Sequence, residues 1–351
     1  MDKPSEESLL PNLLGRLVSH LYAKIAPILT SRIPERYYAV YRQRVARRAA
    51  RMVSLADSPE VVFERGYVPP LIAAAGGKDR PISVMDALAK SPHMLILGAV
   101  GSGKSTLLGF LAWYLATRQD PSVVHHLTFR LFGQALDDLM PLLIDLEKWT
   151  PSGDSLEQAF LSAMSANGFP SGDSFLRQRL EAGQCVLLLD GLDHVHTTAQ
   201  RAEIVALVST YPRNLWVITS RPSETASGLA AELPGFATYQ LQGMDDSQMA
   251  GFLNRHLSSL MAAGLLAACE RNEELAQLAR IPGMATSMCH ALQQQTTSTV
   301  RIPPLIGACL QTLRNRLVSV PVHRDSSPPD ELSLLQRLAY QMQIRGRPVD
   351  Y

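Results

Sequence analysis

Two spacings of apolar residues alternate along the middle of this 351-residue chain. Short, almost wholly apolar runs predict buried strands, and between them apolar residues recur every three or four positions, as on one face of a helix. The predicted strands span residues 94–97, 142–146, 185–190, 215–219 and 237–241, with 127–132 as an alternative for the second. The predicted helices span 82–88, 104–116, 156–164 and 175–180. Strands that alternate with helices predict an α/β fold, in which a parallel sheet is flanked by helices.

The chain before and after this region shows helical spacing only. Apolar residues recur from Leu10 to Ile25, and a second helix is predicted from Pro34 to about Val53. The second helix carries a basic face, made of Arg42, Arg44, Arg47, Arg48 and Arg51, beside an apolar stripe. Such a face suits contact with an anionic membrane or with nucleic acid. A solvated basic face over a core-facing stripe explains the same pattern and is more common, so the pattern favours that interpretation.

Composition narrows the class of protein. Lys and Arg total 33 against 32 Asp and Glu, and this balance argues against a chain that mainly coats nucleic acid. The four cysteines show no Cys-x-x-Cys spacing, which is typical of reduced thiols rather than of a zinc site or a disulfide framework. No secretory signal and no apolar run of about 20 residues is visible. We therefore expect a soluble, cytoplasmic protein.

The segment after the first predicted strand carries the chemistry. Its spacing, Gly-x-x-x-x-Gly-Lys-Ser, is that of a phosphate-binding P-loop. The expected phosphate-binding residues are Gly98, Ala99, Val100, Gly101, Ser102, Gly103, Lys104, Ser105 and Thr106. Glycines let backbone N–H groups turn toward a phosphate, and the helix that begins at Lys104 adds unpaired N–H donors. Lys104 can reach the outer phosphates of a nucleoside triphosphate, and the Ser105 hydroxyl can ligate Mg²⁺.

Two later strands end in residues that a P-loop site requires. Asp190 ends a buried strand and can hold Mg²⁺, usually through a bound water, at the carboxyl edge of a parallel sheet. Asp193 follows shortly after and could direct a second carboxylate at the attacking water or the metal. Arg221 follows the next strand and could contact the γ-phosphate through its guanidinium. A surface arginine at the start of a loop explains Arg221 as well.

In this order, these elements resemble the NACHT family of P-loop NTPases, within the class of signal-transducing ATPases with numerous domains. The residues that carry the resemblance are Gly98–Thr106, Leu187–Asp193, Thr219–Pro222, Tyr239–Asp246 and Ile281–Met284. The second motif is the diagnostic one, because a strand aspartate, a small residue, an apolar residue and a second acid form the family's variant of the Mg²⁺ strand. The resemblance covers roughly residues 60 to 350, and it implies that Pro282 packs near the adenine of a bound nucleotide.

The resemblance implies a molecular switch that binds ATP with Mg²⁺. Slow hydrolysis would be coupled to conformational change and to self-association or binding of a partner protein, in signalling or defence. One departure bears on catalysis, because family members commonly have a glutamate after the second acid and this chain has His194. Two alternatives stay open, an NTP-driven motor of the AAA type and a scaffold that binds nucleotide with little hydrolysis.

The same elements predict four regions. These are an N-terminal helical region (1–65), a NACHT-like P-loop domain (66–243), a small helical domain (244–325) and the incomplete start of a winged-helix-like segment (326–351). A stretch rich in Gly and Pro, 66–81, is predicted to be the connector into the P-loop domain. Relatives generally carry repeats that sense a signal, and none follows here. The chain is therefore either a piece of a longer protein or a minimal member whose partner supplies the sensing.

Overall fold

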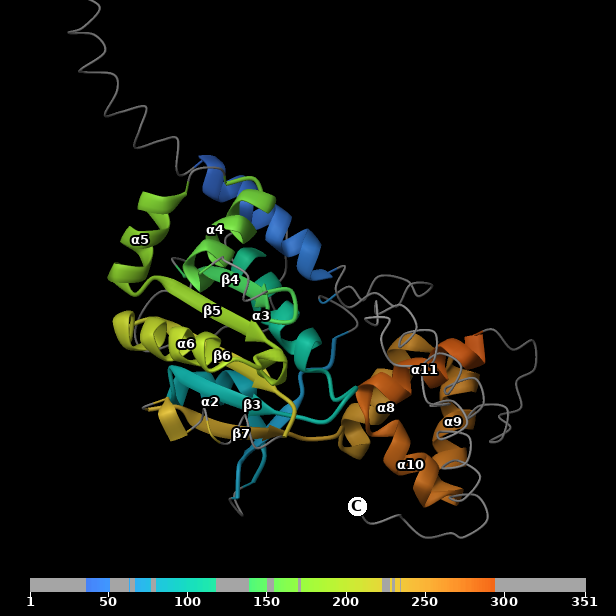
Figure 1. Cartoon of the computed structure of the whole chain (residues 1–351). Helices are drawn as coiled ribbons and strands as arrows, with labels where there is room; N and C mark the ends of the chain where they lie inside the picture. Colours follow the sequence, from blue (N-terminus) through green and yellow to red (C-terminus); the bar gives the residue numbers. More distant parts are fainter. Residues whose placement is uncertain are drawn as a thin grey trace, which may run out of the picture. The chain divides into compact units, whose positions relative to one another are not determined.

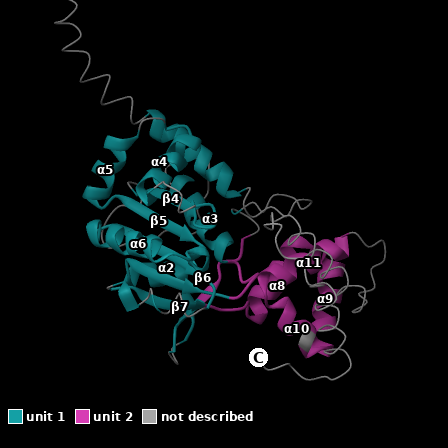
Figure 2. Ribbon diagram, viewed as in Figure 1, with its two compact units in different colours: residues 1–64, 72–98, 104–240 teal, residues 65–71, 99–103, 241–351 magenta. Residues whose placement is uncertain are grey.

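The computed structural model of the chain forms two compact units (Figure 1 and Figure 2). The residues that it describes are 36–50, 63, 67–76, 80–117, 139–149, 155–169, 172–222, 228, 231–233 and 235–293. The first unit, here called the sheet unit, takes its residues from 1–64, 72–98 and 104–240. The second, the helical unit, takes its residues from 65–71, 99–103 and 241–351. The chain thus passes between the units at both ends of the P-loop.

The described strands form one sheet with the order β2-β1-β7-β3-β6-β5-β4. In chain order the strands are β1 (Leu71–Ala74), β2 (Ile82–Ser83), β3 (His93–Leu97), β4 (Met140–Asp145), β5 (Cys185–Asp190), β6 (Leu215–Ser220) and β7 (Ala237–Leu241). The pairs β7–β3, β3–β6, β6–β5 and β5–β4 are parallel. Strands β5 and β6 are almost wholly buried, which explains why they appear in the sequence as continuous apolar runs. The fold is therefore α/β, with a mostly parallel sheet flanked by helices.

The sheet contains two strands that the apolar pattern does not predict. Strand β1 lies inside the stretch predicted as a connector, and β2 occupies the first two residues of the helix predicted over 82–88. Helix α2 (Val84–Lys90) begins only after Ser83, whose hydroxyl accepts a hydrogen bond from the Asp86 N–H. Strands of four and two residues are too short to show an alternation, so turn-forming neighbours dominate the pattern there.

The described part of the sheet unit also contains an α-helix, α6, that the sequence analysis did not predict. Its described helices include α3 (Lys104–Thr117), α4 (Leu156–Ala166), α5 (Asp173–Ala182), the 3₁₀ helix η3 (Leu192–His194) and α6 (Thr198–Thr210). Helix α6 was not predicted, because its buried side chains are few: Gln200, Ile204 and Val208. Its start did carry a signal, since Thr197 and Gln200 form a capping box.

The basic helix predicted near the N-terminus is present over residues 36–50. Its apolar stripe is buried, and the Tyr41 hydroxyl donates a hydrogen bond of 2.6 Å to the Pro141 carbonyl on β4. Three arginines of its predicted basic face are exposed, namely Arg44, Arg47 and Arg48. The helix therefore packs on the sheet unit through a core-facing stripe, as the sequence favours. Contact of its basic face with a membrane or nucleic acid stays a prediction.

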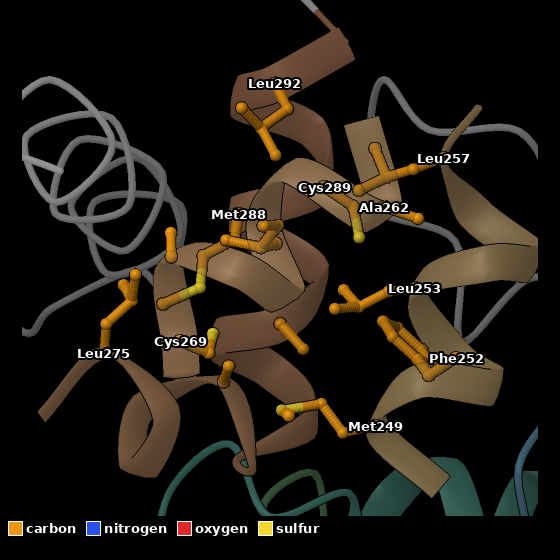
Figure 3. Close-up of a cluster of buried hydrophobic side chains, with 14 of the residues drawn as sticks. Met249, Phe252, Leu253, Leu257, Ala262, Cys269, Leu275, Met288, Cys289 and Leu292 are labelled. Atoms are coloured by element: carbon orange, nitrogen blue, oxygen red, sulfur yellow. The ribbon is translucent and has the colours of Figure 1, made fainter. Parts of the chain in front are cut away.

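The helical unit has its own hydrophobic core (Figure 3). Its described helices are α8 (Asp246–His256), α9 (Ser259–Arg271), α10 (Glu273–Ala279) and α11 (Pro282–Gln293). Leu253, Leu265 and Met288 are at most 1% exposed, and each comes from a different helix. Helix α8 begins at a second capping box, in which the Asp245 and Gln248 side chains each accept a backbone N–H of the other. A core shared by several helices stabilises them beyond their individual propensities.

Several predictions of the sequence analysis lie outside the described residues. These are the helix over 10–25, the alternative strand over 127–132, Arg51 and the winged-helix-like segment over 326–351. Among the residues that the structure does describe, no helix is both long enough and apolar enough to cross a membrane.

Candidate nucleotide-binding site

The P-loop begins where β3 ends, and glycine shapes it. The Gly98 N–H donates to the Ser220 carbonyl at 3.0 Å, which extends the pairing of β3 with β6. Gly101 and Gly103 have φ angles of +75° and +97°, in the left-handed region that other residues rarely adopt. Backbone of this kind turns N–H groups toward one concave side and so makes an anion-binding nest.

The loop contains a buried hydroxyl that indicates whether a phosphate fits the site. Ser102 Oγ is shielded from solvent and forms no hydrogen bond to the described residues. Leaving a buried hydroxyl unpaired costs free energy, about 1–3 kcal/mol in typical proteins. A phosphate oxygen in the nest would accept a hydrogen bond from it. The glycine backbone and this hydroxyl therefore fit a phosphate group.

The centre of the loop packs inside the helical unit, against the start of α11. The Gly283 N–H donates to the Gly101 carbonyl at 2.9 Å. A Cβ on Gly283 would lie 3.0 Å from both Cα and O of Gly101, so a larger residue at position 283 would press on the loop backbone. The Pro282 ring lies 3.9 Å from the position that a Cβ on Gly103 would take. Pro282 thus lies beside the P-loop, and its contact with adenine stays a prediction.

The last P-loop residues lie in the first turn of helix α3, and the rest of this helix is buried. Its residues from Leu107 to Thr117 are all buried. In the first turn, by contrast, Ser105 is exposed and Thr106 is half-buried. The Ser105 hydroxyl is therefore accessible to an ion while the helix that carries it is held by its core contacts.

Lys104 lies among the charged groups predicted for the site. Its Nζ donates to the Gly98 carbonyl at 2.7 Å. Burial lowers the pKa of Lys104 below its ordinary value, the carboxylates of Asp193 and Asp190 oppose that shift, and the Arg221 guanidinium adds to it. The other three side chains thus act electrostatically on Lys104, although the sequence separates Lys104 from Arg221 by three strands of the sheet. The structure brings together the residues that the sequence predicts.

Asp190 ends β5 and is held by a hydroxyl from the next strand. Thr219 Oγ1 donates to Asp190 Oδ1 at 2.5 Å, and it accepts the Gly191 N–H at 3.2 Å. Thr219 has no exposed surface, so the bond is shielded from water. Gly191 has a φ of +84°, which turns the chain sharply into η3 and places Asp193 beyond the strand end. The sequence analysis did not anticipate the role of Thr219 as a partner, although its place at the end of β6 was a signal.

Asp193 is bound by Arg221 at both carboxylate oxygens. The Arg221 backbone N–H donates to Oδ1 at 3.0 Å, and its Nε lies 3.1 Å from Oδ2. His194 Nε2 lies 3.7 Å from the same Oδ2. Arg221 is therefore more than a surface arginine at a loop start, because it forms an ion pair with the second acid of the site. The sequence predicted separate tasks for the two residues and did not predict this pair.

The donor set fits a magnesium ion that is completed by nucleotide and water. No group of three or more His, Cys, Asp and Glu side chains that could enclose a metal occurs in the part of the chain that the structure describes. Mg²⁺ in nucleotide sites keeps several waters and uses one or two protein oxygens with phosphate oxygens. Asp190 and Ser105 match that requirement. Asp190 also borders a cavity of about 370 Å³ toward β4, α4 and the helix over 36–50.

The fold and these residues define the class of protein. A mostly parallel sheet, a Gly-rich loop that leads into a helix at Lys104, and Asp190 two strands away from the loop strand are the parts of a P-loop NTPase. Residues 93–259 match the model of the NACHT domain. Residues 93–259 are therefore similar to a NACHT domain of a P-loop NTPase, and this part of the chain is a nucleotide-binding NTPase domain.

Comparison with solved structures adds a distant likeness. The structure of C. elegans PCH-2 is 16% identical in sequence, with a TM-score of 0.36. The similarity covers 65% of this chain and 62% of that chain, so the chain spans less than two thirds of that structure. No curated protein matches the chain.

Proposed function

We propose that this chain is a nucleotide-operated switch, which binds ATP with Mg²⁺, hydrolyses it slowly, and changes its conformation and its association with copies or partners in a cytoplasmic signalling process. One observation carries the proposal. Lys104, Asp190, Asp193 and Arg221 interact at one edge of the sheet, while Arg221 occupies the carboxylate that would act on water. A site with its phosphate-binding parts in place and its second acid engaged suits retention of a nucleotide better than rapid turnover.

Each residue has a defined task in this proposal. ATP supplies the terminal phosphoanhydride bond, and Mg²⁺ supplies positive charge that stabilises the phosphates. Lys104 and the loop N–H groups neutralise and orient the outer phosphates, and Ser105 and Asp190 hold the ion. Arg221 contacts the γ-phosphate with its guanidinium, which gives the triphosphate and diphosphate states different affinities for the site. Such a difference is what any ligand-driven change of conformation requires.

Two features favour slow hydrolysis over a motor. Asp193 accepts the Arg221 backbone N–H at one oxygen and forms an ion pair with the guanidinium at the other, so this carboxylate is not available as a base until the guanidinium moves. In addition, His194 stands where relatives commonly have a glutamate, and an imidazole is a different base from a carboxylate. A fast ATPase that forms a closed ring would indicate the AAA-type motor instead. A His194→Glu variant that gains turnover would support the view that hydrolysis is weak in this chain.

Substitution of the P-loop lysine tests the proposal. Lys104→Ala should abolish binding of ATP–Mg²⁺ in a calorimetric titration, while circular dichroism shows a folded protein, because the variant lacks the charge that meets the phosphates. Lys90→Ala is the matched control, since this lysine is exposed at the end of α2, before β3 begins, whereas the P-loop follows the end of β3. Retained ATP affinity in Lys104→Ala would contradict the site, and identification of the nucleotide that co-purifies with the protein would test the adenine preference.

A further inference from the structure

We propose that Thr219 is a positioning residue, which fixes the Asp190 carboxylate so that one chosen oxygen meets the magnesium ion. This inference rests on the function proposed above and adds a residue that the NACHT motif by itself does not assign to the metal. It begins from the place of the two residues in the sheet. Asp190 follows Leu189 on β5, and Leu189 is paired with Ile218, the residue before Thr219 on β6. The two side chains therefore leave neighbouring strands at the same level.

The hydrogen bonds around the Thr219 hydroxyl determine its direction. The hydroxyl accepts the Gly191 N–H at 3.2 Å, and an N–H can only donate. Its own hydrogen is then directed to Asp190 Oδ1, at 2.5 Å, a separation typical of a hydrogen bond to an ionised carboxylate. The arrangement satisfies all three groups when Asp190 is charged, which is the form that a magnesium site needs.

This arrangement divides the work between the two carboxylate oxygens. Oδ1 is committed to Thr219, whereas Oδ2 has no hydrogen bond or ion pair to any residue that the structure describes. Because Thr219 has no exposed surface and its side chain is β-branched, both its rotamer and the plane of the carboxylate are restricted. Oδ2 is thus the oxygen left for the ion or for a water bound to it. Partners of this kind orient metal ligands, and losing one typically lowers metal affinity about 10–100-fold.

A merely structural role for Thr219 is the competing explanation. The same hydroxyl also accepts the Gly191 N–H and so supports the turn there. In that explanation, removing it lowers the stability of the protein and has no other effect. The two roles differ in what they change. A positioning role changes the Mg²⁺ dependence of nucleotide binding, while a structural role changes the melting temperature and leaves that dependence as it was.

The experiment compares Thr219→Val, Thr219→Ala and Thr219→Ser. For each, the affinity for ADP is measured by calorimetry in Mg²⁺ and in excess chelator, and Mn²⁺ uptake by the nucleotide complex is followed by electron paramagnetic resonance. Thr219→Val and Thr219→Ala should reduce the increase in ADP affinity that Mg²⁺ produces by about tenfold or more. Their ADP affinities in excess chelator should stay near that of the wild type. Ser should keep most of the gain, because it retains the hydroxyl. If Val does not fold, the Ser and Ala pair still isolates the hydroxyl.

Ser220→Ala is the matched control, because this neighbouring hydroxyl is equally buried and donates instead to the Arg221 carbonyl at 2.9 Å. The positioning role would be overturned if Mg²⁺ increased the ADP affinity of Thr219→Val and Thr219→Ala as much as that of the wild type. It would also be overturned if Ser220→Ala lost as much of this increase as they do. In both cases the proposed function would stand. Absence of any Mg²⁺-dependent nucleotide binding in the wild type would overturn the proposed function itself, and the inference with it.

Discussion

At the scale of single residues, the site depends on how each charge is held rather than on which charges are present. Asp190 and Asp193 are three positions apart in sequence, yet one accepts from a buried hydroxyl and the other from an arginine. The first is fixed by a neutral partner and stays available to a cation. The second is neutralised by its partner. Two aspartates at one strand end are therefore held in two different ways.

The lowered pKa of Lys104 leads to a prediction about pH. Burial disfavours the charged ammonium in the free protein, whereas bound phosphates favour it, so the pKa of Lys104 is lower in the free state than in the complex. Nucleotide affinity should then be full below the free-state pKa and fall as pH rises through it. Calorimetry from about pH 7 to about pH 10 checks this, a range that includes values below the ordinary lysine pKa.

Lys104→Arg is the control for this prediction. A guanidinium stays charged over the whole range, so any affinity that remains should lose its dependence on pH. The same fall in affinity with pH in both proteins would assign the titration to another group.

Gly191 illustrates the cost of the turn between the two acids. An alanine there would combine a φ of +84° with a Cβ only 2.9 Å from His194 Cδ2. Gly76 has a φ of +73° with nothing within 4 Å of its Cβ position. Gly76→Ala therefore measures only the free-energy cost of placing a residue with a Cβ at a positive φ. We expect Gly76→Ala to cost about 1–2 kcal/mol of unfolding free energy and Gly191→Ala to cost more. Equal losses in urea denaturation would show that the His194 contact relaxes freely.

At the scale of elements, the apolar pattern identified the long, buried pieces and missed the short or weakly amphipathic ones. Strands β5 and β6 were evident because β5 has five consecutive apolar residues before Asp190, β6 has four before Thr219, and all of these are buried. Strand β1 has four residues, and α6 buries only three side chains. The apolar pattern of each is therefore too weak to stand out from the sequence around it. Their place in the fold is set by neighbours that lie far away in sequence.

The helix over 36–50 gives a prediction that separates packing from surface charge. Tyr41 is buried, and its hydroxyl donates to the Pro141 carbonyl, so Tyr41→Phe should lower the unfolding free energy by about 0.5–1.5 kcal/mol. Arg47 is exposed, and Arg47→Ala should change it by less than about 0.5 kcal/mol. Urea denaturation measures both. A larger loss for Arg47→Ala would mean that the basic face, and not the stripe, holds the helix.

At the scale of the whole molecule, the P-loop belongs to both compact units. Gly98 and Lys104 are assigned to the sheet unit, while Ala99–Gly103 pack with the helical unit. The switch proposed above draws on this division of the loop.

The proposed switch predicts that the particle mass changes with the nucleotide state. Light scattering on the protein with Mg²⁺ and a slowly hydrolysed ATP analogue should give a larger particle than with Mg²⁺ and ADP, because the γ-phosphate selects the associating conformation. Lys104→Ala should give the same mass under both conditions. Equal masses for the wild type would contradict self-association, and binding of a different partner protein would then be the output to test.

The sequence by itself determined the parts of this protein that depend on local spacing. A glycine-rich loop between a strand and a helix is encoded by consecutive residues, as are the strand that ends in Asp190 and the α/β alternation. Only the tertiary structure decided the partners, because these join residues far apart in the chain. Arg221 reaches Asp193 across 28 positions and Thr219 reaches Asp190 across 29. Such pairs form when parallel strands bring their carboxyl ends to one edge, and no periodicity in the sequence records which side chains meet there.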